Sequence, residues 1–119
     1  SWVQADLARG ERYFVLEQDA VPVGCVAYEI PEPRLAYLNR LSVLPAFRQR
    51  GLGAQLVSHV IALARQDAIA RISIGVIGES TDLQHWYRGL GFVDGETRRF
   101  VHLPFSVKYM SYPVDSLNA

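Results

Sequence analysis

The sequence has little of three things that often indicate a protein's class: cysteine, net charge and long apolar runs. A single cysteine, Cys25, excludes a disulfide within the chain and is typical of a reducing cytoplasm. Because 12 Lys and Arg side chains balance 12 Asp and Glu, there is no electrostatic case for nucleic acid or an anionic membrane as the main partner. No apolar run approaches the roughly 20 residues that span a bilayer, and no signal peptide is visible. We therefore expect a cytoplasmic protein with no nucleic-acid and no membrane partner.

Histidines with the spacing of metal ligands are also lacking. His59, His85 and His102 stand outside any ligand motif, so we expect no metal. What the chain does have is a globular composition, with 50% hydrophobic and 20% charged residues. Its 119 residues are enough for one domain with a core of its own, and no repeat or linker divides them. The sequence is therefore interpreted as a single domain over residues 1–119.

The hydrophobic patterns predict strands and helices in a definite order. Residues 1–10 carry a weak helical pattern that stops at Gly10. Strand patterns cover residues 12–17, 23–30, 35–44, 70–77 and 106–114, and a further strand begins at Phe92. Helical patterns cover residues 51–66 and the segment from the capping-box spacing of residues 81–84 to Gly91, a candidate for the left-handed position after a helix.

This order of elements predicts an α/β (α+β) fold. An antiparallel meander followed by strand–helix–strand crossovers implies a mixed, mostly antiparallel central sheet flanked by helices. The strand over residues 35–44 is apolar on both faces except for Asn39, Arg40 and Ser42. Because a strand with two apolar faces is buried on both sides, we expect this one in the middle of the sheet.

The most informative stretch, Arg48-Gln49-Arg50-Gly51-Leu52-Gly53, joins that strand to the first long helix. At the start of a helix the first N–H groups have no intrahelical partner, and the helix dipole favours negative charge there. Gly51 and Gly53 would remove Cβ atoms where phosphates approach the backbone, and Arg48 and Arg50 would add charge-assisted donors. The stretch is therefore interpreted as a pyrophosphate site. For these six residues alone, an ordinary turn with solvated arginines is the alternative.

The stretch completes neither a Walker loop nor Gly-x-Gly-x-x-Gly, but it resembles the acyl-coenzyme A pyrophosphate loop, Arg/Gln-x-x-Gly-x-Gly/Ala, of the GNAT superfamily of N-acetyltransferases. Further along, Tyr87-Arg88-Gly89-Leu90-Gly91-Phe92 resembles the family's Tyr-x-x-Leu-Gly-Phe, and Val107-Lys108-Tyr109-Met110 resembles its closing strand. These matches occur in the family's order and extend over nearly the whole chain. They imply the GNAT fold with its N-terminal strand and helix short or missing, through true absence or through truncation.

The resemblance implies acetyl-CoA as the co-substrate. The strand segment 41–43 would offer backbone groups to the pantetheine and the thioester, and the loop as far as Ala54 would hold the pyrophosphate. Ser80 stands where many members carry Asn and would bond to the pantetheine or its water. The cofactor-binding residues implied in this way are Leu41, Ser42, Val43, Arg48, Gln49, Arg50, Gly51, Leu52, Gly53, Ala54, Ser80 and Tyr87.

Acetyl transfer from a thioester to an amine needs an acid for the leaving thiolate and a base for the amine. The resemblance implies that Tyr87, whose phenol has an ordinary pKa near 10, supplies the acid, with a core aromatic as the alternative role. Glu29 is the first candidate for the base and Glu79 the second. For each carboxylate, a solvated charge at a strand end is the alternative, with a water chain accepting the proton instead.

These inferences predict an N-acetyltransferase that moves an acetyl group from acetyl-CoA to a primary amine by direct attack in a ternary complex. The acceptor would be a small-molecule or peptide amine. A non-catalytic acyl-CoA-binding or regulatory domain is the alternative, and a nucleotide-binding module is a third. An acyl-enzyme on Cys25 lacks a nearby histidine in the sequence. The short N-terminal part could leave a sheet edge or apolar surface exposed, which favours a homodimer.

Overall fold

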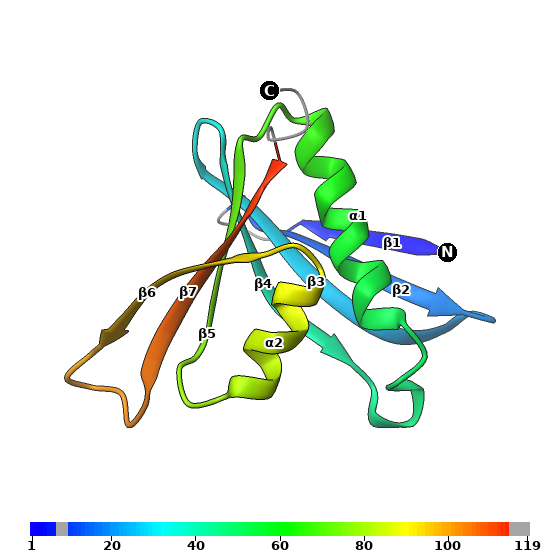
Figure 1. The fold of residues 1–119 in the computed structure, drawn as a ribbon. Coiled ribbons are helices and arrows are strands. Elements are labelled where there is room, and N and C mark those ends of the chain that lie inside the picture. The colour runs from blue at the N-terminus through cyan, green and yellow to red at the C-terminus, as the bar shows by residue number, and fades with distance from the viewer. Residues whose placement is uncertain (7–9, 115–119) are drawn as a thin grey trace.

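The computed structural model describes residues 1–6 and 10–114, which form a single curved sheet and two helices (Figure 1). Within them the seven strands lie in the order β1-β2-β3-β4-β5-β7-β6. The strands are β1 (Trp2–Asp6), β2 (Arg12–Gln18), β3 (Val21–Glu32), β4 (Leu35–Val43), β5 (Arg71–Ile77), β6 (Val93–Arg99) and β7 (Ser106–Pro113). The helices are α1 (Leu52–Gln66) and α2 (Thr81–Gly89), with the short 3-10 turn η1 (Pro45–Phe47) before α1.

Neighbouring strands are antiparallel except β4 and β5, which run parallel. This pattern confirms the predicted mixed, mostly antiparallel sheet, and β4 lies in its middle as expected. The parallel pair arises because α1 carries the chain from the end of β4 back to the start of β5, as parallel neighbours require.

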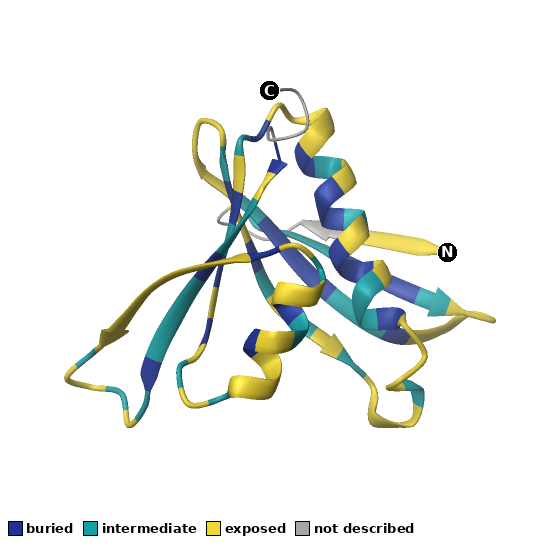
Figure 2. Cartoon of the chain, viewed as in Figure 1, coloured by how far each residue is buried: buried dark blue, intermediate teal, exposed yellow. Residues whose placement is uncertain are grey.

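Both helices pack on the same face of the sheet (Figure 1). The core lies between this face and the helices, and the dark blue positions in Figure 2 follow it. Helix α1 supplies Leu52, Leu56, Val60 and Ala64, one from each turn and all buried. Because burying one Leu or Val contributes roughly 1.5–3 kcal/mol, this row stabilises the helix far more than its local propensity does.

The N-terminal segment corrects a second prediction. Residues 1–10 were expected to contain a weak helix, but Trp2–Asp6 is a strand paired antiparallel with β2, with Trp2 opposite Leu16. The Trp2 ring stacks on His59 of α1, with 4.0 Å between ring centroids. Tertiary contacts therefore override a weak local helical pattern. The described residues thus contain a short first strand, with no helix before β2.

The two central strands separate partway along their length. They pair only at Leu35–Tyr37 of β4 and Arg71–Ser73 of β5. Beyond this point β4 stays paired with β3 as far as Val43, and β5 stays paired with β7 as far as Ile77. Figure 1 shows the two strands diverging, with α2 in front of the gap between them. The backbone edge of residues 38–43 that faces the gap is therefore left without a partner strand.

Candidate functional site

Helix α1 begins directly beside the gap, and its first turn is arranged to attract an anion. Its N-cap, Gly51, has φ +76°, a left-handed conformation that glycine adopts without strain. No side chain caps the helix and no acidic residue lies in its first turn. Among the described residues, no side chain therefore caps the first N–H groups or lies as a negative charge at the positive end of the dipole.

A cavity of about 400 Å³ lies between β4, η1 and the ends of the two helices. It contains most of the residues predicted to bind the cofactor: Leu41, Ser42, Val43, Arg48, Gln49, Gly51, Leu52, Gly53 and Ala54. Arg50, Ser80 and Tyr87 do not line it. Three residues line it that the sequence reasoning missed, Phe47, Leu83 and Trp86. They add an apolar wall, to which Phe47 comes from η1, whereas Leu83 and Trp86 come from α2.

The two arginines of the loop differ in their contacts. The Nε of Arg48 donates a hydrogen bond to the carbonyl of Val43 over 3.1 Å, which ties the loop back onto the end of β4. The guanidinium of Arg50 lies 5.3 Å from the centre of the Phe47 ring. Both residues are exposed, and neither is paired with a carboxylate of the described residues.

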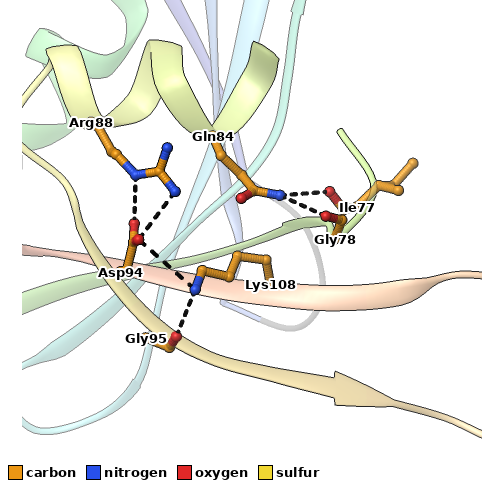
Figure 3. A network of polar contacts seen from close by, with 7 residues as sticks. All are labelled: Ile77, Gly78, Gln84, Arg88, Asp94, Gly95 and Lys108. Carbon is orange, nitrogen blue, oxygen red and sulfur yellow. Dashed lines mark hydrogen bonds and ion pairs between the residues drawn. The ribbon is translucent and has the colours of Figure 1, made fainter. Parts of the chain in front are cut away.

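Helix α2 is held in place by its own polar contacts (Figure 3). The side-chain amide of buried Gln84 donates to the carbonyls of Ile77 (3.4 Å) and Gly78 (2.9 Å). Ser80 is the N-cap and makes no side-chain capping bond. The helix therefore begins where predicted, at Thr81, but the capping-box interpretation is wrong, because Gln84 binds the preceding loop instead of the helix start.

The other end of α2 is tied to β6 and β7. Arg88 makes two hydrogen bonds to Asp94, of 2.8 and 3.1 Å, and this pairing raises the pKa of Arg88 and lowers that of Asp94. Lys108 donates to the carbonyl of Gly95 over 3.0 Å and lies 4.0 Å from Asp94 (Figure 3). After the helix Gly91 has φ +107°, which confirms the positive φ predicted there.

Tyr87 lies on α2 between Gln84 and Arg88, the two residues whose contacts hold the helix in place. Its side chain is buried, and its ring meets Trp86 and Phe92 edge-on at centroid distances of 4.9 and 5.2 Å. Burial raises the pKa of Tyr87 to about 12. Its hydroxyl has no hydrogen-bond partner among the described residues. The phenol therefore stays protonated at neutral pH.

A bulge in β4 lies beside the cavity. Cys25 of β3 pairs with Ser42 and Ala27 pairs with Asn39, so Val26 alone stands opposite two residues of β4. One of these two, Arg40, has φ +54°, which is unusual for a residue other than glycine. Its guanidinium donates to the hydroxyl of Tyr13 over 2.6 Å. The bulge leaves one backbone amide out of the ladder at the edge of the gap.

A second cavity, of about 680 Å³, lies on the face of the sheet without helices. Tyr37 and Asn39 of β4 line it, together with side chains of β5, β7 and β6. Asn39 belongs to this cavity, whereas Leu41, two residues further along β4, belongs to the first one. The two cavities therefore approach each other across β4 at its bulge.

Comparison with known proteins identifies the family. The model of the acetyltransferase (GNAT) family matches residues 1–92. The chain belongs to the GNAT family. Among curated relatives of this GNAT chain, the amino-acid acetyltransferase of Edwardsiella ictaluri is 29% identical over 83 residues, which make up 69% of this chain and 18% of that protein. The chain thus spans about a fifth of the length of that relative and of similar ones.

Solved structures agree with this GNAT assignment. A GNAT family acetyltransferase from Elizabethkingia anophelis with acetyl-CoA bound has a TM-score of 0.82 and 17% identity, covering 87% of this chain and 76% of that one. The ribosomal-protein-S18-alanine N-acetyltransferase of Escherichia coli has a TM-score of 0.80 and 20% identity, covering 91% of this chain and 72% of that one. At these identities the likeness establishes the fold.

The two carboxylates predicted as candidate bases lie apart in the GNAT fold. Glu79 accepts hydrogen bonds from the backbone N–H of Ser106 (3.1 Å) and from its hydroxyl (2.9 Å). The hydroxyl bond is the main reason why the pKa of Glu79 is lowered, and Arg99 at 3.8 Å adds to it. Glu29 pairs with Tyr37 across β3 and β4 and is half-buried. A lowered pKa makes Glu79 a weaker base than an ordinary carboxylate.

The described part of the GNAT chain contains neither a cluster of metal-binding side chains nor a membrane-spanning helix. Nowhere in it do three or more His, Cys, Asp or Glu side chains come close enough to bind a metal ion together. Neither α1 nor α2, nor any other helix found there, combines the length and apolar character needed to cross a membrane.

Proposed function

We propose that the chain is an acetyl-CoA-dependent N-acetyltransferase that transfers the acetyl group directly to a primary amine in a ternary complex. The observation that carries this proposal is the pair of cavities on opposite faces of the sheet, which approach each other where β4 and β5 separate. Two reactants that enter from opposite sides can meet at this gap without a covalent enzyme intermediate. The proposal gains support from the GNAT neighbour that holds acetyl-CoA.

Coenzyme A would occupy the cavity on the helical face. Its pyrophosphate would accept hydrogen bonds from the first N–H groups of α1, where Gly51 leaves the backbone accessible and Arg48 and Arg50 add positive charge. Its pantetheine would run beside residues 41–43, whose backbone edge has no partner strand. Amide groups of a ligand pair with such an edge as an added strand does.

The acceptor amine would enter from the cavity on the other face. Its nitrogen attacks the thioester carbon, the carbon–sulfur bond breaks, and the sulfur leaves as a thiolate that takes up a proton. The carbonyl oxygen gains negative charge on the way, and the unpaired amide at the bulge beside Arg40 would stabilise it. Holding the two reactants together removes further free energy from the barrier.

Two side chains are proposed for the proton transfers. Tyr87, protonated at neutral pH, would give its proton to the departing sulfur. Glu29 would take the proton of the amine, directly or through water, because it lies next to Tyr37, which lines the acceptor cavity. Glu79 is the weaker candidate because its carboxylate already binds Ser106.

The experiment that tests the function measures thiol release from acetyl-CoA with a panel of amines that includes amino acids, peptides and polyamines. Calorimetry measures coenzyme A binding in parallel, and ATP serves as the control ligand. We expect coenzyme A to bind and thiol release to depend on one class of amine. Binding without acceptor-dependent release would favour the non-catalytic alternative. Equal binding of ATP would favour the nucleotide-binding module. The homodimer and the cytoplasmic location stay predictions.

A further inference from the structure

The cavity on the helix-free face has the form of a groove, which we call the acceptor groove. It is defined by Tyr37, Asn39, Arg71, Ser73, Gly75 and Tyr109. Ser73 and Gly75 are small residues of the central strand β5. Their partners on the flanking strands are Tyr37 of β4 and Tyr109 of β7. The groove therefore has a floor of small residues between two aromatic walls, which suits a narrow ligand.

The charges in this groove are unequal. Arg98 and Glu96 of β6 both line it, and they neutralise each other through an ion pair of 2.8 Å. Arg71 lines it as well, and it makes no ion pair with any carboxylate of the described residues. Among the described residues, the groove thus carries one cation, Arg71, that no carboxylate neutralises.

Arg71 lies at the end of the groove away from the gap between the strands. Tyr37 pairs with Ser73, Asn39 lies two residues beyond Tyr37, and Arg71 lies two residues before Ser73. Four strand steps, about 13 Å, therefore separate the levels of Asn39 and Arg71 along the sheet. A long arginine side chain covers part of this span, and the remainder leaves room for a small acceptor with its amine at the gap.

We propose that Arg71 binds a carboxylate of the acceptor, so that the preferred acceptor is a small amine that bears a carboxylate. This inference rests on the proposed function. A guanidinium forms two parallel hydrogen bonds with a carboxylate, which fixes the orientation of the ligand as well as holding it. An acceptor bound in this way presents its amine toward Asn39 and the thioester. A polyamine carries only positive charge, and the positive charge of Arg71 therefore repels it.

The test compares matched acceptors that differ only in the carboxylate. Rates of acetyl-CoA-dependent thiol release are measured for α-amino acids and their carboxamides, with dipeptides and β-alanine as longer carboxylates and spermidine as a cation. We expect kcat/KM to be about tenfold higher or more for the preferred amino acid or peptide than for its amide. The comparison of the rates with amino acids and with dipeptides shows whether the preferred carboxylate belongs to a free amino acid or to a peptide.

Two variants test whether Arg71 causes the preference for acceptors that bear a carboxylate. Arg71→Met keeps the aliphatic part of the side chain and is expected to lower kcat/KM for the carboxylate-bearing acceptors to the level of their amides. Arg65→Met removes the same charge from the exposed side of α1, away from the groove, and should keep the preference. Equal rates for acids and amides in the unchanged protein, or an unaltered preference in Arg71→Met, would overturn the inference.

A binding measurement separates this inference from the proposed function. N-acetylated amino acids, the products of such a reaction, should raise the melting temperature of the unchanged protein but not that of Arg71→Met. If only amides or polyamines are acetylated from acetyl-CoA, the proposed N-acetyltransferase activity is supported and the proposed role of Arg71 is contradicted. If coenzyme A does not bind but the N-acetylated amino acids do, carboxylate binding in the acceptor groove is supported and the proposed function is contradicted. If the products do not stabilise the protein, the carboxylate site is absent.

Discussion

Gly53 in the first turn of α1 lies against the indole of Trp86 on α2. A Cβ atom built on Gly53 would be 3.2 Å from Cζ2 and 3.4 Å from Cη2 of that ring. The sequence interpretation assigned both glycines of the loop to the approach of phosphate. In the structure only Gly51 has a positive φ, and Gly53 lets the two helices approach each other beside the coenzyme cavity. The second glycine therefore helps to shape the cavity wall through its contact with Trp86.

The first prediction follows from this contact. Gly53→Ala should push Trp86 and α2 away from α1 and weaken coenzyme A binding several-fold, measured by calorimetry. Gly89→Ala is the matched control, because a Cβ there meets nothing within 4 Å. In the last turn of α2 it should leave binding unchanged and raise the free energy of unfolding, by up to about 1 kcal/mol. Equal binding by both variants would show that the contact with Trp86 does not shape the site.

The second prediction concerns Tyr87. Tyr87→Phe removes only the hydroxyl, so the packing against Trp86 and Phe92 should persist and coenzyme A affinity should stay unchanged. If the phenol protonates the leaving sulfur, kcat should fall about 100-fold, as expected for the loss of a general acid. Because the pKa of Tyr87 is raised to about 12, the hydroxyl should cause no loss of rate in the unchanged protein up to pH 10. An unchanged kcat would remove Tyr87 from the mechanism.

The elements that could be predicted from the sequence are those whose signal is local. The buried row from Leu52 to Ala64 repeats every four residues, and the helix has the predicted bounds to within one residue. The left-handed conformation of Gly51 was not predicted, because the predicted helix begins at this residue, whereas the helix in the structure begins at Leu52. The first strand could not be predicted, because its partner β2 and the ring of His59 decide its conformation, and neither is visible in residues 1–10.

In the candidate site too, the residues that could be predicted are those that lie close together in the sequence. The loop and the end of β4 are continuous in sequence, so the residues that line the coenzyme cavity from that side were found. Leu83 and Trp86 join it only because α2 packs over the gap. The acceptor groove needs the register between β4, β5 and β7, since that register places two tyrosines on either side of small residues. No pattern within one strand carries that information.

The third prediction distinguishes the two carboxylates. Glu29→Gln should lower kcat/KM by about 100-fold at neutral pH if this group takes up the proton of the amine. Glu79→Gln should leave kcat/KM and its pH dependence nearly unchanged, because Glu79 holds Ser106 rather than a reactant. Its effect should instead be a lower melting temperature. A pH profile for each variant decides between them, and the opposite result would make Glu79 the base.

The fourth prediction is a pH dependence of stability caused by His59. Its ring is stacked on Trp2 and meets the edge of Phe14 at 4.8 Å, and its Nε2 is buried with no hydrogen-bond partner among the described residues. Burial lowers the pKa of His59 below its ordinary value of about 6.5. The unfolded chain therefore binds a proton more readily than the folded one, and stability falls as the pH drops below about 6.5.

His59→Leu tests this dependence because it keeps an apolar side chain between Trp2 and Phe14 but cannot bind a proton. Denaturant unfolding of both proteins at pH 8 and pH 5 gives the change in free energy of unfolding for each. The carboxylates of the chain are the same in both proteins, so their contributions cancel in the comparison. The unchanged protein should lose more stability than His59→Leu on acidification. Equal losses would mean that β1 leaves His59 accessible to protons in the folded state.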